Sequence, residues 1–257
     1  MDRQRLSDAI RAHAEADPRI LVAWFGGSDA TGRTDELSDL DPVFVTEVAD
    51  IEGVFDGVET FMRSTVGILA AYRFPSPTPH GHEQALYLGE RIPPSLGIDL
   101  VVMDVATPES ERLIEIERHG KGVVMVDRAG WFDVPVRIDS TGHRRRIDSH
   151  LSSISGLHPH LMPLIEKAIA RGDWLDAVAR HHARLLRPLC DLMRIEHDPD
   201  RFDFGFRYLD RDLPDAERRL LERLAFVADP DALTAAVEEA RKQVEERLRR
   251  LGHPVPV

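Results

Sequence analysis

The chain has 257 residues, of which 42% are hydrophobic and 30% charged, as in ordinary globular proteins of one large or two modest domains. Its apolar runs are only a handful of residues long, whereas a bilayer span needs roughly 20, so we expect no membrane association. The net charge of −12 is uneven, because residues 1–138 carry 13 basic and 24 acidic side chains. This balance makes nucleic acid an unlikely partner and suits a divalent metal, a cationic substrate or simply a solvated surface.

Two further features indicate the compartment. Cys190 is the single cysteine, which excludes an internal disulfide and any cysteine-rich metal site. The first residues, Met-Asp-Arg-Gln-Arg-Leu, lack the hydrophobic core of a signal peptide. We therefore expect a cytoplasmic protein in a reducing environment.

The first half of the chain mixes strand and helix signals. Helical spacing of apolar residues predicts helices over 3–16 and 54–64, and Thr107-Pro108 indicates the start of a third that reaches about residue 118. Short apolar runs bounded by turn residues predict strands over 20–25, 42–45, 68–74, 85–88, 98–103 and 123–126. This half is therefore expected to be an α/β (α+β) domain with a mixed sheet of five or six strands.

The second half is predicted to be an all-α helical bundle. Candidate helices run near 143–155, 160–171, 173–197, 214–227 and 230–250. Pro188 is expected to kink the third of these helices. The change of pattern places a domain boundary near residues 135–145, which gives domains over 1–138 and 139–257.

The most informative segment follows the first predicted strand. Gly27-Ser28 forms a turn after that strand, and ten residues further on come Asp39 and Asp41, separated by Leu40. On an extended backbone residues i and i+2 point to the same side, so both carboxylates converge while Leu40 points away. Two such carboxylates repel each other unless a cation lies between them, and Mg²⁺ prefers carboxylate oxygens. The turn offers backbone N–H groups and a hydroxyl to a phosphate chain, so the segment predicts a metal–nucleotide site.

This motif resembles the nucleotidyltransferase superfamily, which includes DNA polymerase beta, the minimal nucleotidyltransferases and the antibiotic nucleotidyltransferases that act on lincosamides and aminoglycosides. The resemblance implies an N-terminal nucleotidyltransferase domain over residues 1–138 and a helical substrate-binding domain over residues 139–257. Looser matches to later strands of the family occur in Leu96-Gly-Ile-Asp-Leu-Val and Gly122-Val-Val-Met-Val-Asp-Arg.

The resemblance also implies roles for particular residues. Gly27 and Ser28 match the turn that holds the nucleotide's phosphates. Asp39 and Asp41 match the pair that binds Mg²⁺ together with the nucleoside triphosphate. Asp99, in Gly97-Ile-Asp-Leu-Val, is the candidate for the family's third carboxylate, which helps to bind a second metal or takes the proton from the acceptor hydroxyl.

One residue departs from the family pattern. Asp29 follows the Gly-Ser pair, where many relatives carry Arg or a small residue, and an acid beside a triphosphate is unfavourable unless it points away. Arg33 is the candidate to supply positive charge to the phosphates instead. Asp104, an odd five residues after Asp99, is expected to face the other side of its strand.

Three residues are candidates for contact with the acceptor. Glu83 precedes a predicted strand and is placed facing the site. His181 and His182 are candidates from the helical half, through a cleft between the domains. His181 also lies on the apolar stripe of its helix, so the leading interpretation for it is a hydrogen-bonded core histidine.

The resemblance implies an enzyme that transfers a nucleoside monophosphate from a nucleoside triphosphate, with ATP the first candidate, to a hydroxyl of a small molecule, releasing pyrophosphate. An aminoglycoside or lincosamide antibiotic is the candidate acceptor, with Mg²⁺ as cofactor. Two alternatives stay open: a non-catalytic nucleotide-binding sensor or partner module, and a protein-nucleotidylating toxin–antitoxin component. A homodimer is also open, because relatives share their sites between two copies.

Overall fold

A break in the packing after residue 138 divides the chain into two units. The computed structural model describes residues 1–76 and 78–256. The units are Met1–Ile138 and Asp139–Val257, and these bounds coincide with those expected from the sequence. Within the described part of the chain, none of the helices has the length and apolar character that crossing a bilayer requires.

Unit 1 is built on a mixed six-stranded sheet, which confirms the predicted fold class. The strand order is β3-β4-β5-β2-β1-β6. Strand β2 pairs with β5 in parallel, and the other neighbours are antiparallel. The strands are β1 (Val22–Phe25), β2 (Pro42–Thr46), β3 (Ala70–Arg73), β4 (Glu83–Leu88), β5 (Ile98–Asp104) and β6 (Val123–Asp127).

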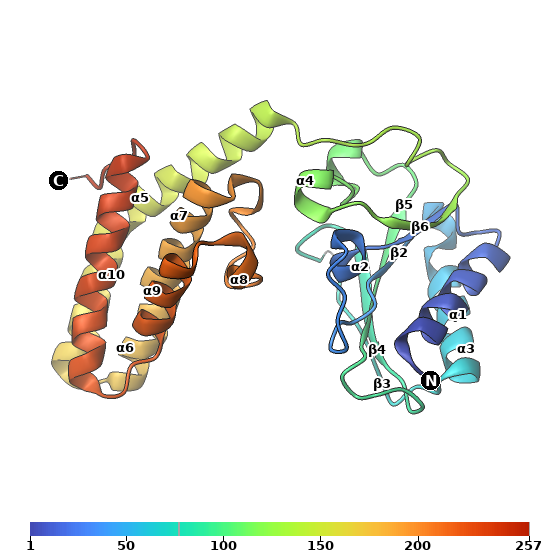
Figure 1. The fold of residues 1–257 in the computed structure, drawn as a ribbon, viewed down its shortest axis with the longest axis horizontal. Helices are drawn as coiled ribbons and strands as arrows, with labels where there is room; N and C mark the ends of the chain where they lie inside the picture. Colours follow the sequence, from blue (N-terminus) through green and yellow to red (C-terminus); the bar gives the residue numbers. More distant parts are fainter. Residues whose placement is uncertain (77, 257) are drawn as a thin grey trace. The chain divides into compact units, whose positions relative to one another are not determined.

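The two faces of this sheet are covered differently. On one face, α1 (Arg3–Ala16) and α3 (Ile51–Thr65) lie side by side and bury apolar residues such as Leu6, Phe44 and Phe55 in a common core (Figure 1). On the other face, Trp24 and its neighbours pack against Trp131 from the segment after β6. Alternation along each strand sorts the side chains between these faces. The second face is the one that carries the candidate site.

Short helices connect the strands of unit 1: α2 (Gly27–Thr31), η1 (Val48–Asp50), η2 (Glu109–Glu111) and α4 (Ile116–His119). The helix expected from Thr107 to about residue 118 is therefore wrong. Leu113 adopts a left-handed φ of 57°, which interrupts the helix, and Ile114 beside it is buried against the sheet. Tertiary packing of Ile114 overrides the local helical signal there.

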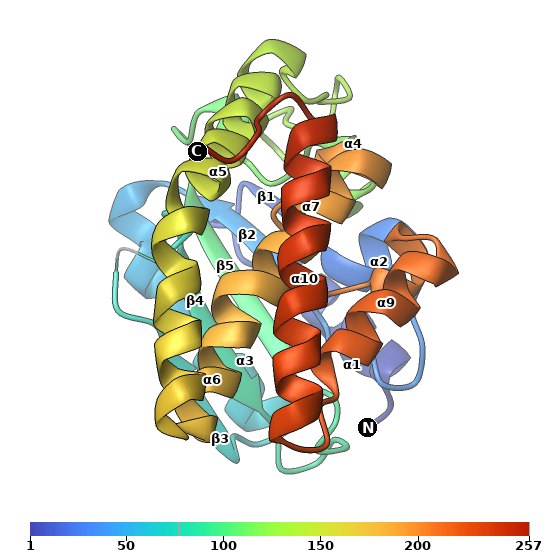
Figure 2. The same cartoon turned by 90° about the vertical axis from the view of Figure 1, so that its left-hand side faces the viewer.

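The regular secondary structure of unit 2 is helical in the residues that the structure describes, as the sequence predicts. Its elements are α5 (Ser140–Arg171), α6 (Trp174–His181), η3 (His182–Leu186), α7 (Arg187–His197), η4 (Pro199–Arg201), α8 (Leu209–Asp212), α9 (Asp215–Ala225) and α10 (Pro230–Arg250). Figure 2 shows α5 and α10 running the length of this unit. The apolar stripes of α5, α7 and α10, with residues such as Leu151, Leu189 and Val244, form one continuous core.

Three prolines of unit 2 lie within helical segments. Residues 143–155 and 160–171 belong to a single helix, α5, which continues through Pro159 and Pro163. Each proline lacks an N–H donor, yet the buried positions keep their helical spacing through this stretch, so packing maintains the helix. Pro188 lies in the first turn of α7, and a π-helical segment, η3, ends two residues before it.

Candidate active site

The turn after β1 brings its backbone against the second aspartate of the motif. The N–H of Gly26 donates to the carbonyl of Asp41 at 2.9 Å. Gly27 has a φ of 53°, and a Cβ at this position would lie 1.9 Å from Asp41 Oδ2. Only glycine fits both the left-handed backbone and this close approach. The turn opens α2, where Ser28 Oγ is buried and finds no hydrogen-bond partner among the described residues.

Alternation places Asp39 and Asp41 on the same side, as the spacing predicts. Leu40 between them is fully buried and bridges to Ile98, with Leu40 N–H donating to the Gly97 carbonyl at 3.0 Å. Both carboxylates therefore turn away from the core that holds Leu40. Strand β2, which begins directly after Asp41, is the neighbour of β5 in the sheet, and β5 carries the third carboxylate, Asp99.

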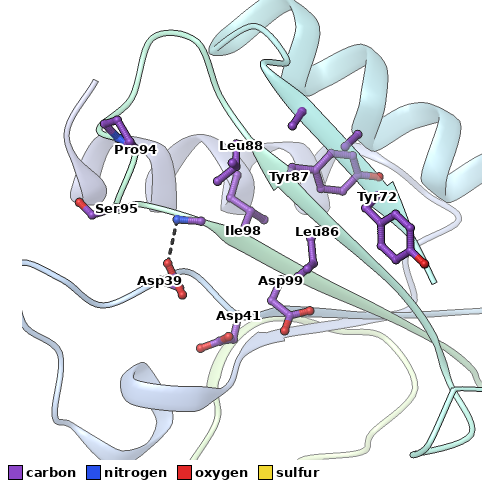
Figure 3. A pocket seen from close by; sticks show the side chains of 13 residues that line it. Asp39, Asp41, Tyr72, Leu86, Tyr87, Leu88, Pro94, Ser95, Ile98 and Asp99 are labelled. Atoms are coloured by element: carbon purple, nitrogen blue, oxygen red, sulfur yellow. Dashed lines mark hydrogen bonds between the residues drawn. The ribbon is translucent and has the colours of Figure 1, made fainter. Parts of the chain in front are cut away.

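Asp99 joins the other two carboxylates at one pocket. Asp39, Asp41 and Asp99 all line a cavity of about 430 Å³, and Figure 3 shows Asp41 and Asp99 close together at its floor. Asp39 Oδ1 accepts the Gly97 N–H at 2.8 Å, which holds it at the rim. The structure thus brings together the three acids that the sequence singled out.

The electrostatics of this cluster favour a cation. Burial raises the pKa of Asp41 to about 6, and the neighbouring charges of Asp99, Asp39 and Asp29 add to this effect, while Arg3 opposes it. Because a bound divalent cation would relieve both the repulsion and the cost of burial, the residues fit Mg²⁺. The unpaired Ser28 hydroxyl beside them offers a further polar group to a phosphate.

Arg3 is a site residue that the sequence analysis missed, and it accounts for Asp29. Its guanidinium forms two hydrogen bonds with the Asp29 carboxylate, at 2.6 and 3.1 Å. It also donates to the backbone carbonyls of Ser38 and Asp39 at 3.1 and 2.9 Å. Arg3 therefore neutralises the acid that departs from the family pattern and fixes the loop before Asp39. In the sequence, the one indication of this contact is that an acid at position 29 needs a partner of opposite charge.

Gln84 and His80 are two further site residues that the sequence analysis did not identify. Gln84 Nε2 donates to Asp99 Oδ1 at 2.7 Å, and Gln84 Oε1 lies 3.2 Å from His80 Nε2. On the other side of the His80 ring, Nδ1 lies 3.2 Å from Thr78 Oγ1 and 3.3 Å from the His82 backbone nitrogen, and these contacts hold the ring in place. This chain of contacts fixes both the amide of Gln84 and the carboxylate of Asp99 that it holds.

Two predicted acceptor contacts are corrected by the structure. Glu83 lies within β4 rather than before it, so it faces the side of the sheet opposite Gln84, where Arg73 pairs with it at 3.3 Å. His181 is fully buried, and its Nε2 bonds to the Leu224 carbonyl at 2.9 Å. Burial lowers the pKa of His181, so it is a neutral core histidine, in agreement with the leading interpretation.

The other two predicted contacts stay predictions. Arg33 lies in the exposed loop after α2, where its backbone N–H donates to the Ser28 carbonyl at 3.0 Å. His182 is half-buried at the start of η3 in unit 2.

A second acidic group lies in unit 2. Among the described residues, Glu196, His197 and Glu217 place one ligand atom each within 4.8 Å of one another, a spacing that the three site aspartates do not meet. Arg247 pairs with both Glu196 and Glu217, the latter at 2.6 Å. Because this guanidinium already neutralises the two carboxylates, the group is a structural ion-pair cluster.

Among known proteins, the chain is similar to solved structures. No family model matches the chain, and no curated protein matches it significantly. An aminoglycoside 6-adenyltransferase from Bacillus subtilis has 14% identity and a TM-score of 0.36, covering 97% of this chain and 92% of that one. A nucleotidyltransferase-like protein from Exiguobacterium sibiricum has 12% identity and a TM-score of 0.39, covering 96% of this chain and 74% of that one.

Proposed function

We propose that unit 1 is the catalytic domain of a nucleotidyltransferase, which transfers a nucleoside monophosphate from a nucleoside triphosphate to a hydroxyl of a small molecule. The observation that carries this proposal is the convergence of Asp39, Asp41 and Asp99 on one pocket beside the Gly27-Ser28 turn. The pKa of Asp41, which burial and then the nearby carboxylates raise, supports this proposal, because a bound cation would offset both effects.

The chain's own groups divide the work of binding. Asp39 and Asp41 would hold Mg²⁺ with the triphosphate, and the backbone N–H groups and hydroxyl of the Gly27-Ser28 turn would bind the phosphates. Mg²⁺, when bound, neutralises charge on the triphosphate and on the pyrophosphate leaving group. Arg3 keeps the negative charge of Asp29 paired, so that it repels the substrate less.

Asp99 is assigned the proton transfer. Its carboxylate accepts the proton of the acceptor hydroxyl, and the oxygen forms a bond to the α-phosphorus in line with the leaving group. The bond between the α-phosphorus and the bridging oxygen breaks, and pyrophosphate leaves with that electron pair. Gln84 holds Asp99 in position during this step through its 2.7 Å hydrogen bond.

Several finer assignments follow from the sequence resemblance alone. These are ATP as the nucleotide, an aminoglycoside or lincosamide antibiotic as the acceptor, a role in antibiotic resistance, and a cytoplasmic location. A homodimer belongs to the same group of proposals.

To test this proposal, the protein is incubated with α-phosphate-labelled nucleoside triphosphates, Mg²⁺, a panel of hydroxylated small molecules and a cell extract. Asp99→Asn is compared with Asp104→Asn, a matched change on the same strand whose side chain bonds to the Ala106 N–H instead. Label is expected to move to a small molecule with the wild type and Asp104→Asn, and transfer by Asp99→Asn is expected to fall at least about 100-fold.

Other results would contradict the proposal. Label on a protein of the extract would favour the protein-nucleotidylating alternative. Mg²⁺-dependent nucleotide binding with no transfer to any acceptor would favour the sensor.

A further inference from the structure

The pocket at the three aspartates continues over an apolar part of the sheet. Leu86 on β4 is the cross-strand partner of Asp99, and Tyr72 on β3 is in turn the partner of Leu86. Directly paired residues share a face, so Tyr72, Leu86 and Leu88 lie on the same side of the sheet as Asp99 (Figure 3). We call these three residues the apolar shelf.

The apolar shelf is exposed although its side chains are large and hydrophobic. Tyr72 is 56% exposed, Leu86 39% and Leu88 38%. All three line the same cavity of about 430 Å³ as the carboxylates, so the shelf and the candidate site form one continuous surface. Of the described residues that line this cavity, the three aspartates are the charged ones. A pocket with apolar walls and a few convergent polar groups is typical of a small-molecule site.

The order of the strands indicates which substrate reaches the shelf. The Gly27-Ser28 turn follows β1, on one side of β2, whereas β5, β4 and β3 lie on the other side. Phosphates held by the turn therefore extend from the carboxylates toward β1. In-line displacement requires the attacking hydroxyl to approach the α-phosphorus from the side opposite the leaving pyrophosphate. That side is the one occupied by Asp99 and, beyond it, by the apolar shelf.

We propose that the apolar shelf binds the body of the acceptor and that the acceptor is a neutral hydroxyl compound with an apolar or aromatic face. This inference rests on the proposed nucleotidyl transfer, and it replaces the amine-bearing antibiotics that the sequence resemblance implies with an uncharged acceptor. A polycationic acceptor would find no carboxylate in the lining of this cavity besides the three that bind metal and take the proton. A flat apolar body, in contrast, would cover Leu86 and Tyr72 and remove them from water.

Binding at the shelf is measured first without catalysis, with the neutral fluorescent probe N-phenyl-1-naphthylamine. The Leu86→Gln variant is compared with Leu175→Gln, a matched change at a leucine that is 89% exposed on α6. Leu86→Gln is expected to weaken probe binding about tenfold, and Leu175→Gln to leave it unchanged. Tyr72→Ala, at a more exposed position, repeats the test if Leu86→Gln does not fold. Equal binding by the wild type and the folded shelf variants would overturn the proposal.

Transfer of label then identifies what the shelf binds. With α-phosphate-labelled ATP and Mg²⁺, 2-naphthaleneethanol and related neutral aromatic alcohols are offered in competition with kanamycin. Label is expected on the alcohols, and Leu86→Gln is expected to raise their KM about tenfold while leaving the KM for ATP unchanged. A rise in the KM for ATP alone would mean that the shelf holds the nucleobase, and would overturn the proposal.

Failure of the inference differs from failure of the function on which it rests. Efficient transfer to kanamycin alone, unaffected by Leu86→Gln, would overturn the neutral acceptor and leave nucleotidyl transfer in place. Absence of Mg²⁺-dependent nucleotide binding would overturn the proposed function itself and, with it, the assignment of the shelf to an acceptor.

Discussion

Gly27 and Asp41 are packed so closely that a single added carbon at Gly27 would overlap the carboxylate, with 1.9 Å between this Cβ and Asp41 Oδ2. This contact joins the Gly27-Ser28 turn to one of the three site aspartates, although 13 residues separate Gly27 and Asp41 in the chain. The positions of the two groups therefore depend on each other.

Gly27→Ala is accordingly expected to displace Asp41 and to reduce nucleotidyl transfer about 100-fold, since a shift of about 1 Å at a catalytic group has this order of effect. Gly32→Ala is a matched control, because Gly32 also has a positive φ, of 66°, but a Cβ there would meet nothing within 4 Å. Both variants should lose about 1–2 kcal/mol of stability from backbone strain. Urea unfolding measures the loss of stability, and the transfer rate measures the loss of activity. Equal activity of the two variants would contradict the proposed role of the contact between Gly27 and Asp41.

Removing Arg3 should weaken nucleotide binding. In Arg3→Ala, Asp29 keeps its charge without a partner near the phosphates, and the loop before Asp39 loses two hydrogen bonds. We expect the dissociation constant for Mg²⁺–ATP, measured by calorimetry, to rise about tenfold. Arg5→Ala, which removes an exposed arginine from the same helix, should have no effect. The double variant Arg3→Ala/Asp29→Asn should recover most of the affinity if charge is the cause.

The raised pKa of Asp41 predicts how stability depends on pH in the metal-free protein. The folded state holds this proton more tightly than the unfolded chain, whose Asp has a pKa near 3.8. The contribution to stability is therefore fully present below pH 3.8 and is lost as pH rises through about 6. It amounts to about 3 kcal/mol for a shift of about two pKa units.

Asp41→Asn tests this prediction because asparagine does not titrate. The free energy of unfolding of the wild type, measured relative to this variant in urea, should fall by about 3 kcal/mol between pH 3 and pH 7. Mg²⁺ should restore wild-type stability at pH 7 and not at pH 4, since it binds the deprotonated carboxylate. A constant difference between the two proteins across this range would contradict the account of Asp41.

Loss of the hydrogen bond between Gln84 and Asp99 should reduce kcat more than it changes KM. Gln84→Leu leaves Asp99 without the donor that holds it, and we expect kcat to fall about tenfold. His80→Ala should have a smaller effect in the same direction, because it acts through Gln84. Glu83→Gln, on the opposite face of β4, is the control. An equal loss of kcat in Glu83→Gln would show that the substitutions disturb strand β4 as a whole and do not act through Asp99.

The sequence predicted the parts of the site that depend on local geometry. Alternation around Leu40 was enough to place Asp39 and Asp41 on one side, because the buried residue between them fixes the register. The same rule explains the error at Glu83. Strand β4 begins at this residue, and a difference of one position moves a side chain to the other face, so Gln84 and not Glu83 reaches the site.

Contacts between distant segments could not be predicted in this way. The pairing of Arg3 with Asp29 depends on how α1 packs against the sheet, and the contact of Gln84 with Asp99 depends on the β4–β5 register. In the helical unit, α5 continues through two prolines because its buried stripe is uninterrupted. Each case is decided by tertiary packing, which single-sequence propensity does not contain.

We propose that the cluster of Asp39, Asp41 and Asp99 catalyses nucleotidyl transfer. Following labels on the α- and γ-phosphates of ATP tests this proposal most directly. Wild type and Asp41→Asn are incubated with Mg²⁺, the cell extract and ATP labelled at either the α- or the γ-phosphate. With the wild type, we expect the α-label to join the acceptor and the γ-label to leave as pyrophosphate, and we expect Asp41→Asn to catalyse neither event. Transfer of the γ-label to the acceptor, or undiminished transfer by Asp41→Asn, would contradict the proposal.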